Sequence, residues 1–310
     1  MSIPPLTPDR LDPKRAGAAA LSGYFIWGLS PIFYKFLAFA NPSEIVLWRA
    51  IWSAPVLLLL LYMGRRIGPA FAVLNDRKTL LVMLATSLLI AANWWLFIFA
   101  VNSGRVLEVS LGYFINPLMV VAVGVFVARE RFGPLRAVAV GLAVMGVLNQ
   151  VITVGELPWL ALVLAGSFTA YGYVRKTIQV DARIGLFWET VIIAIPSMFV
   201  LSFLEIQGGA NAGHFLDGPY ETILLMMTGP MTVAPLLLFL LGARGLTFAT
   251  IGVLQFIAPT LQFIVGLVYG EPFSVAYLFT FIFIWSGLAV FVFDLLHFER
   301  KQKRAGIRPA

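Results

Sequence analysis

One apolar stretch in the first half of the chain carries a carboxylate, a glycine and an amide at intervals of four residues: Glu108, Gly112 and Asn116. In a helix, that spacing places all three on one face. Pro117 follows directly, and because proline has no N–H group, it leaves the carbonyl of Tyr113 without its helical partner. A carboxylate, an amide and a free carbonyl together could bind a polar solute or exchange a proton.

An apolar stretch in the second half repeats this arrangement. Pro259 releases the carbonyl of Gln255, which is the counterpart of Tyr113, and Gln262 lies seven residues after Gln255 on roughly the same face. In lipid a freed carbonyl would lack a partner, so both proline regions are expected to face protein or a hydrated cavity. We interpret the two helix breaks, at Pro117 and Pro259, as predicting a binding site near the membrane midplane. The alternative is that the prolines only kink helices for packing, with the amides forming bonds between helices.

Two charged residues, Arg49 and Glu108, are predicted to lie within the outer half of a membrane, where an ionised side chain is costly. We expect them to interact: Arg49 either neutralises Glu108 or binds an anionic group of the substrate, and Glu108 exchanges protons. In the alternative, Arg49 extends its charge to the interface and Glu108 favours the positive end of its helix. The same dipole argument accounts for Glu189 near a predicted helix start, with a role in an inner gate as the other interpretation.

The elements that position these residues are predicted to be membrane helices. The chain is 60% hydrophobic and 12% charged, with a mean hydropathy of +0.91, whereas soluble domains are about 25% charged. A strand-like alternation of apolar and polar residues is missing, which excludes a transmembrane barrel. Apolar runs long enough to cross the hydrocarbon core predict an all-α integral membrane fold with ten transmembrane helices, at 17–37, 44–63, 79–100, 106–127, 134–151, 157–174, 185–204, 221–241, 246–269 and 273–293.

The two halves of the chain repeat each other. Four residues recur 141 positions later: Lys35 as Lys176, Pro55 as Pro196, Gly104 as Gly245 and Glu130 as Glu271. Because each half holds an odd number of crossings, the second is expected to be inverted relative to the first, an arrangement typical of secondary transporters. Gene duplication without a transport role would leave the same trace. The predicted parts are an N-terminal tail (1–16), a first five-helix repeat (17–151), a second five-helix repeat (157–294) and a basic tail (295–310), around a central cavity.

Basic residues indicate the orientation. Nearly all of the 22 Lys and Arg residues fall on one side when the amino terminus is placed in the cytoplasm. We therefore expect a multi-pass protein of the cell inner (plasma) membrane with both termini cytoplasmic. The net charge of +7 is explained by this sidedness, so nucleic acid is not an expected partner.

Several short motifs resemble one known family. They are Asn93-Trp94, Arg49-x-x-Trp52-Ser53, Ser110-Leu111-Gly112-Tyr113-Phe114-Ile115-Asn116-Pro117-Leu118, Tyr171-Gly172 with Arg175-Lys176, and Leu254-Gln255-Phe256-Ile257 with Pro259-Thr260. Together they are similar to the RarD-type permeases of the EamA branch of the drug/metabolite transporter superfamily, over roughly residues 17–295. The resemblance implies ten helices in two inverted halves around a central substrate cavity, and transport of small metabolites or drugs, mostly outward.

The predicted substrate cavity combines amides with aromatic rings, which suit flat or apolar solutes. Its expected lining residues are Asn93, Trp94, Tyr113, Asn116, Tyr171, Gln255 and Gln262.

Motifs for enzymatic chemistry are missing from the sequence. It has no cysteine and only two histidines, both outside the predicted helices, so neither a metal site nor a histidine-dependent triad is expected at membrane depth. No nucleotide-binding motif occurs, and we expect no cofactor. We interpret the chain as a secondary transporter, not an enzyme, that exports a small-molecule solute by alternating access, with protons as a possible second partner and lipid around it. The alternatives are an uncoupled facilitator or channel and, from another class, a lipid-handling membrane enzyme. Substrate identity and oligomeric state are left open.

Overall fold

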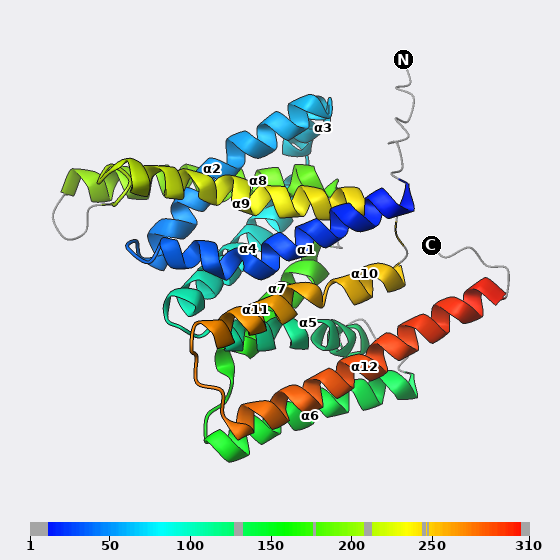
Figure 1. Ribbon diagram of the computed structural model, residues 1–310. Coiled ribbons are helices and arrows are strands. Elements are labelled where there is room, and N and C mark those ends of the chain that lie inside the picture. Colours follow the sequence, from blue (N-terminus) through cyan, green and yellow to red (C-terminus); the bar gives the residue numbers. More distant parts are fainter. Residues whose placement is uncertain are drawn as a thin grey trace.

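The computed structural model describes residues 12–126, 133–175, 178–207, 213–243, 246 and 248–304 (Figure 1). All regular structure in these ranges is helical, which confirms the all-α prediction. The elements are α1 (Pro13–Phe36), α2 (Pro42–Met63), α3 (Ile67–Ala72), the 3-10 turn η1 (Val73–Asn75), α4 (Arg77–Asn102), α5 (Val106–Phe126), α6 (Pro134–Val154), α7 (Trp159–Arg175), α8 (Ala182–Gln207), α9 (Pro219–Ala243), α10 (Phe248–Leu254), α11 (Ile257–Val268) and α12 (Val275–Arg304).

Nine stretches of the described residues are long and apolar enough to cross a membrane, with α10 and α11 counted together as one stretch. They coincide with nine of the ten predicted crossings. The tenth, predicted at 157–174, is α7, whose 17 residues make it shorter than the others. Residues 176 and 177 after it lie outside the described part, as do the repeat partners Lys176, Glu130 and Gly245.

The surface of the helix bundle is apolar, as expected where lipid is the solvent. Large side chains such as Phe199, Ile206 and Val268 are 72%, 84% and 79% exposed. Exposed patches of this size on a soluble protein would promote association. In a bilayer the same side chains face acyl chains, so the exposure agrees with the predicted membrane environment.

Helices of the two sequence halves are interleaved. α1 packs against α9 and α11, α2 against α8 and α9, α4 against α7 and α8, and α5 against α7 and α11. α6 lies beside α12 at one edge of the molecule (Figure 1). The most extensive helix pairs therefore all join a helix before residue 155 to one after it.

Close backbone approach at glycines makes the pair of α6 and α12 tight. A Cβ atom on Gly146 would lie 3.1 Å from the carbonyl oxygen of Thr280, and a Cβ atom on Gly287 would lie 2.7 Å from that of Ala139. As the residue number rises along α6 it falls along α12, so the two helices are antiparallel. Gly141 on α6 has open space around its Cβ position.

These glycines predict opposite effects of one substitution. Gly287→Ala should lower the free energy of unfolding by about 1–3 kcal/mol, because the added methyl group overlaps the α6 backbone. Gly141→Ala, with open space and better helix propensity, should be neutral or stabilise by up to about 1 kcal/mol. Thermal unfolding of both purified variants measures the difference. Equal melting temperatures would show that the crossing tolerates a wider spacing.

Candidate functional site

Arg49, on α2, is a buried cation near the centre of the helix bundle. The residue is 8% exposed, and the carbon of its guanidinium lies 4.2 Å from the ring centre of Trp94 and 5.7 Å from that of Tyr34. Cation–π contacts of this kind partly offset the cost of burying a charge. Trp94 is itself 8% exposed and Tyr34 2%, so the site is closed to solvent in this conformation.

Further polar groups surround Arg49. The side chains of Tyr34 and Tyr113 interact electrostatically with the guanidinium, and Ser53, one helical turn along α2, is fully buried. The Nε of Arg49 and the hydroxyl of Ser53 have no hydrogen-bond partner among the described residues. We call Tyr34, Arg49, Ser53, Trp94 and Tyr113 the Arg49 cluster. Four helices, α1, α2, α4 and α5, contribute to it.

Glu108 does not pair with Arg49 in this structure, contrary to the expectation from sequence. Both of its carboxylate oxygens accept hydrogen bonds from Arg105, three residues earlier, at 2.6 and 2.8 Å. Glu108 also lies in the first turn of α5, where the helix dipole favours a negative charge. The nearby Arg105 and the helix end together hold the carboxylate away from Arg49, which instead contacts Trp94.

Both predicted asparagines bind α7. Asn93 is 2% exposed and donates to the carbonyl of Leu164 at 3.1 Å and to the hydroxyl of Ser167 at 2.9 Å. The carboxamide oxygen of Asn116 accepts from the hydroxyl of Thr169 at 3.0 Å. In this conformation the two amides form bonds between helices, which was the packing alternative for such residues.

Only the second of the two predicted helix breaks is present. α10 ends at Leu254 and α11 begins at Ile257, which leaves Gln255 and Phe256 in a turn just before Pro259. α5, in contrast, runs through Pro117 without interruption. α5 is held against α7 on this face, since a Cβ atom on Gly112 would lie 2.8 Å from the carbonyl oxygen of Ala161, and this close packing supports a continuous helix.

The residues around the break make mostly local or weak contacts. Gln255 donates to the carbonyl of Gly252, and the carbonyl of Pro259 accepts from Ser110 of α5 at 2.8 Å. Gln262 is 3% exposed and donates to the carbonyl of Trp27 at 3.3 Å, while its carboxamide oxygen has no partner among the described residues. The three predicted glutamine and proline positions thus lie at the contact of α11 with α1 and α5, one layer away from Arg49.

A second buried charge was underestimated from sequence. Glu189 on α8 is fully buried and accepts hydrogen bonds from the hydroxyls of Thr86 at 2.7 Å and Tyr171 at 3.0 Å. Arg175 lies 3.4 Å from the same carboxylate. We call Thr86, Tyr171, Arg175 and Glu189 the Glu189 cluster. Because α8 begins at residue 182, Glu189 lies two turns inside the helix, and the helix-start explanation for it is wrong.

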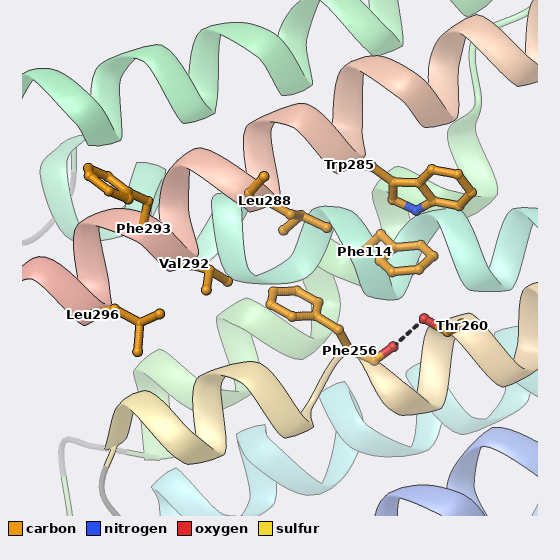
Figure 2. Close-up of a pocket in the computed structure, with 9 residues that line it drawn as sticks. Phe114, Phe256, Thr260, Trp285, Leu288, Val292, Phe293 and Leu296 are labelled. Carbon is orange, nitrogen blue, oxygen red and sulfur yellow. Dashed lines mark hydrogen bonds between the residues drawn. The ribbon is translucent and has the colours of Figure 1, made fainter.

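An apolar groove of about 610 Å³ runs between α12 and the break of α10 and α11 (Figure 2). Among its described lining residues, the one hydroxyl is that of Thr260, which donates to the carbonyl of Phe256. The lining residues are Phe114, Phe256, Thr260, Trp285, Leu288, Ala289, Val292, Phe293 and Leu296. None of them belongs to the Arg49 or Glu189 cluster, so this groove is distinct from the predicted polar cavity.

Glu271, in the segment between α11 and α12, joins the two sequence halves at one end of the bundle. Its two carboxylate oxygens accept hydrogen bonds from the backbone N–H groups of Val106 and Leu107, each at 2.7 Å. These are the first residues of α5, so Glu271 caps that helix from the other half of the chain. Burial raises the pKa of Glu271 above its usual value, although the two backbone donors act in the opposite direction.

Comparison with known proteins gives one consistent result. Residues 15–151 match the EamA-like transporter family. An uncharacterized transporter of Vibrio cholerae is 38% identical, covering 97% of this chain and 99% of its own length. The RarD proteins of Salmonella typhi and Escherichia coli are 39% and 36% identical and cover 95% and 96% of this chain. One crystal structure, 18% identical, has the same fold with a TM-score of 0.57 and covers 89% of this chain.

Proposed function

Since this chain belongs to the RarD-type permeases of the EamA family, in the drug/metabolite transporter superfamily, we propose that it is a secondary transporter working by alternating access. It carries a small metabolite or drug-like solute across the cell inner membrane, with both termini in the cytoplasm. Two inverted five-helix repeats form the carrier, and α7 is its tenth crossing. The observation that carries this proposal is a set of contacts that exchange when the two halves are exchanged.

The α6 and α12 pair gives the clearest example. Gly146 contacts Thr280, and Gly287 contacts Ala139. Gly287 is 141 residues after Gly146, and Thr280 is 141 residues after Ala139. Exchanging the halves therefore converts one contact into the other. Because the two helices are antiparallel, the exchange corresponds to a two-fold axis across them, as an inverted repeat requires.

The same exchange relates contacts made by α1 to contacts made by α7. Gly28 of α1 lies against Ala258, and Thr169 of α7, which is 141 residues after Gly28, hydrogen-bonds to Asn116. Asn116 and Ala258 are the counterparts found in the repeated Phe-Ile-x-Pro motif. α7 thus takes the place of α1 in the second half, which supports its assignment as a crossing.

The two charged clusters occupy related places in the two repeats. Arg175 is the counterpart of Tyr34, and Glu189 is the counterpart of Trp48, next to Arg49. We propose that a solute passes between the Arg49 cluster and the Glu189 cluster as the halves rock, so that each cluster is exposed to one side in turn. Outward transport and proton exchange through Glu108 complete the proposal; the first rests on the family relationship, and the second requires Glu108 to leave Arg105.

Cysteine labelling tests the inverted arrangement, and the absence of native cysteine gives a clean background. Arg65→Cys and Arg136→Cys, near the end of α2 and the start of α6, should react with an impermeant maleimide only from the cytoplasmic side. Glu221→Cys, at the start of α9, should react only from the opposite side. Labelling of residues 65 and 136 from different sides would overturn the topology.

Transport itself is tested in two steps. Comparing the metabolites exported by cells with and without the gene identifies a solute, and that solute is then used in reconstituted vesicles. Saturable counterflow of the labelled solute is the expected result for a carrier. Flux without saturation would indicate a channel, and conversion of a lipid would indicate an enzyme; either result contradicts the proposal.

A further inference from the structure

Arg49 is a buried cation whose neighbours supply no negative charge. Among the described residues, no Asp or Glu side chain lies within 4.0 Å of its nitrogen atoms. The acidic groups buried on the surrounding helices have other partners: Glu44 contacts His214 at 2.7 Å, Glu108 contacts Arg105 at 2.6 Å, and Glu189 contacts Arg175 at 3.4 Å.

The contrast with Glu189 is informative. The buried carboxylate of Glu189 is neutralised by an arginine and receives two hydroxyl hydrogen bonds, as is usual for a buried charge. Arg49 has only the faces of aromatic rings, and its Nε has no acceptor among the described residues. A guanidinium left in this way inside a membrane protein is expected to have a functional partner.

We propose that an oxyanion of the transported solute is that partner, and that the solute carries it on a flat aromatic body. The planar guanidinium binds a carboxylate or a phosphate through two parallel hydrogen bonds. Trp94, Tyr34 and Tyr113 supply rings against which a flat apolar group packs. The unpartnered hydroxyl of Ser53, one turn away on α2, is a further donor for the same anion. This inference rests on the proposed function, because it assigns the solute of that carrier.

Binding measurements on the full chain in lipid nanodiscs test the anion site. The probes are aromatic acids and their amides, which share one ring system and differ in charge: indole-3-acetate with indole-3-acetamide, and benzoate with benzamide. Phenyl phosphate separates a phosphate preference from a carboxylate preference. At least one anion should bind about 30-fold more tightly than its neutral analogue, which corresponds to about 2 kcal/mol. Equal affinity within every pair would overturn the proposal.

Substitution then assigns the preference to Arg49. Arg49→Gln should reduce the affinity for the acid to that of its amide while leaving the affinity for the amide unchanged. Arg49→Lys keeps the charge but loses the planar geometry, and it should retain part of the preference; it also provides a readout where Arg49→Gln does not fold. Arg136→Gln is the matched control, since Arg136 is a more exposed arginine that pairs with Asp294. A preference that survives in both folded Arg49 variants at full strength contradicts the assignment.

Counterflow separates this proposal from the proposed function. Binding that depends on Arg49, in vesicles that show no counterflow, would support the anion site and contradict the carrier. Saturable counterflow of a neutral or cationic solute, with the same KM in Arg49→Gln, would support the carrier and contradict the anion site.

Discussion

Replacing Glu189 by leucine should lower the free energy of unfolding by about 3–5 kcal/mol, the cost typical of removing one partner from a buried ion pair. The change leaves the charge of Arg175, whose side chain is 14% exposed, without its carboxylate. It also removes the acceptor for the hydroxyls of Thr86 and Tyr171. Denaturant-induced unfolding in micelles, followed by tryptophan fluorescence, measures the loss.

Two companion variants show whether the loss comes from the unpaired charge. Arg175→Met combined with Glu189→Leu removes both charges and should recover most of the lost stability, because an apolar pair of similar size often replaces a buried ion pair at little cost. Glu189→Gln keeps the volume and the hydroxyl contacts and should give an intermediate value. If the double variant is as unstable as Glu189→Leu alone, packing around α8 and not charge pairing explains the effect.

Replacing Glu271 by alanine should open the end of the bundle where it caps α5. The variant loses two hydrogen bonds to a charged acceptor, and water replaces part of their energy, so we expect a net effect of about 2 kcal/mol, or about 30-fold in population. Leu107→Cys reports the opening, since Leu107 is 3% exposed and packs against Gly266 of α11. Its reaction with an impermeant maleimide should be faster by that factor when Glu271 is replaced.

An exposed acid provides the control for this experiment. Glu205→Ala, at the end of α8, removes a carboxylate that is exposed and does not bridge α5 and α11. Labelling of Leu107→Cys should be unchanged by Glu205→Ala. Equal labelling rates with and without the Glu271→Ala substitution would show that Gly266 and its neighbours, not the carboxylate, hold α5 and α11 together.

Depth and helix boundaries were the parts most accessible from the sequence, because apolar length alone determines them. Nine of the predicted crossings match the structure. The short α3 and η1 after α2 were not predicted, since six apolar and small residues do not form a recognisable period. The break before α11 followed from Pro259, but the same argument failed at Pro117, where packing against α7 supports a continuous α5.

Partners within the site could not be predicted because a sequence gives the depth of a residue but not the helix opposite it. Arg49 and Glu108 were placed at similar depth, yet Arg49 faces Trp94 while Glu108 is held by Arg105. Glu189 was misinterpreted because α8 begins three residues earlier than predicted. Glu271 was recognised as a repeated residue, but its cap on α5 joins residues 164 and 165 positions apart and left no local signal.

Interleaving of the helices has a consequence for how the chain matures. α1, α2, α4 and α5 each pack mainly against helices that come after residue 155, and α6 packs mainly against α12, the last helix to be synthesised. Contacts of such long sequence separation form late, because the intervening chain must be ordered first. The first half therefore leaves the ribosome with most of its mating surfaces uncovered, and a fragment that ends near residue 155 should be degraded in the cell rather than accumulate as a stable half-protein.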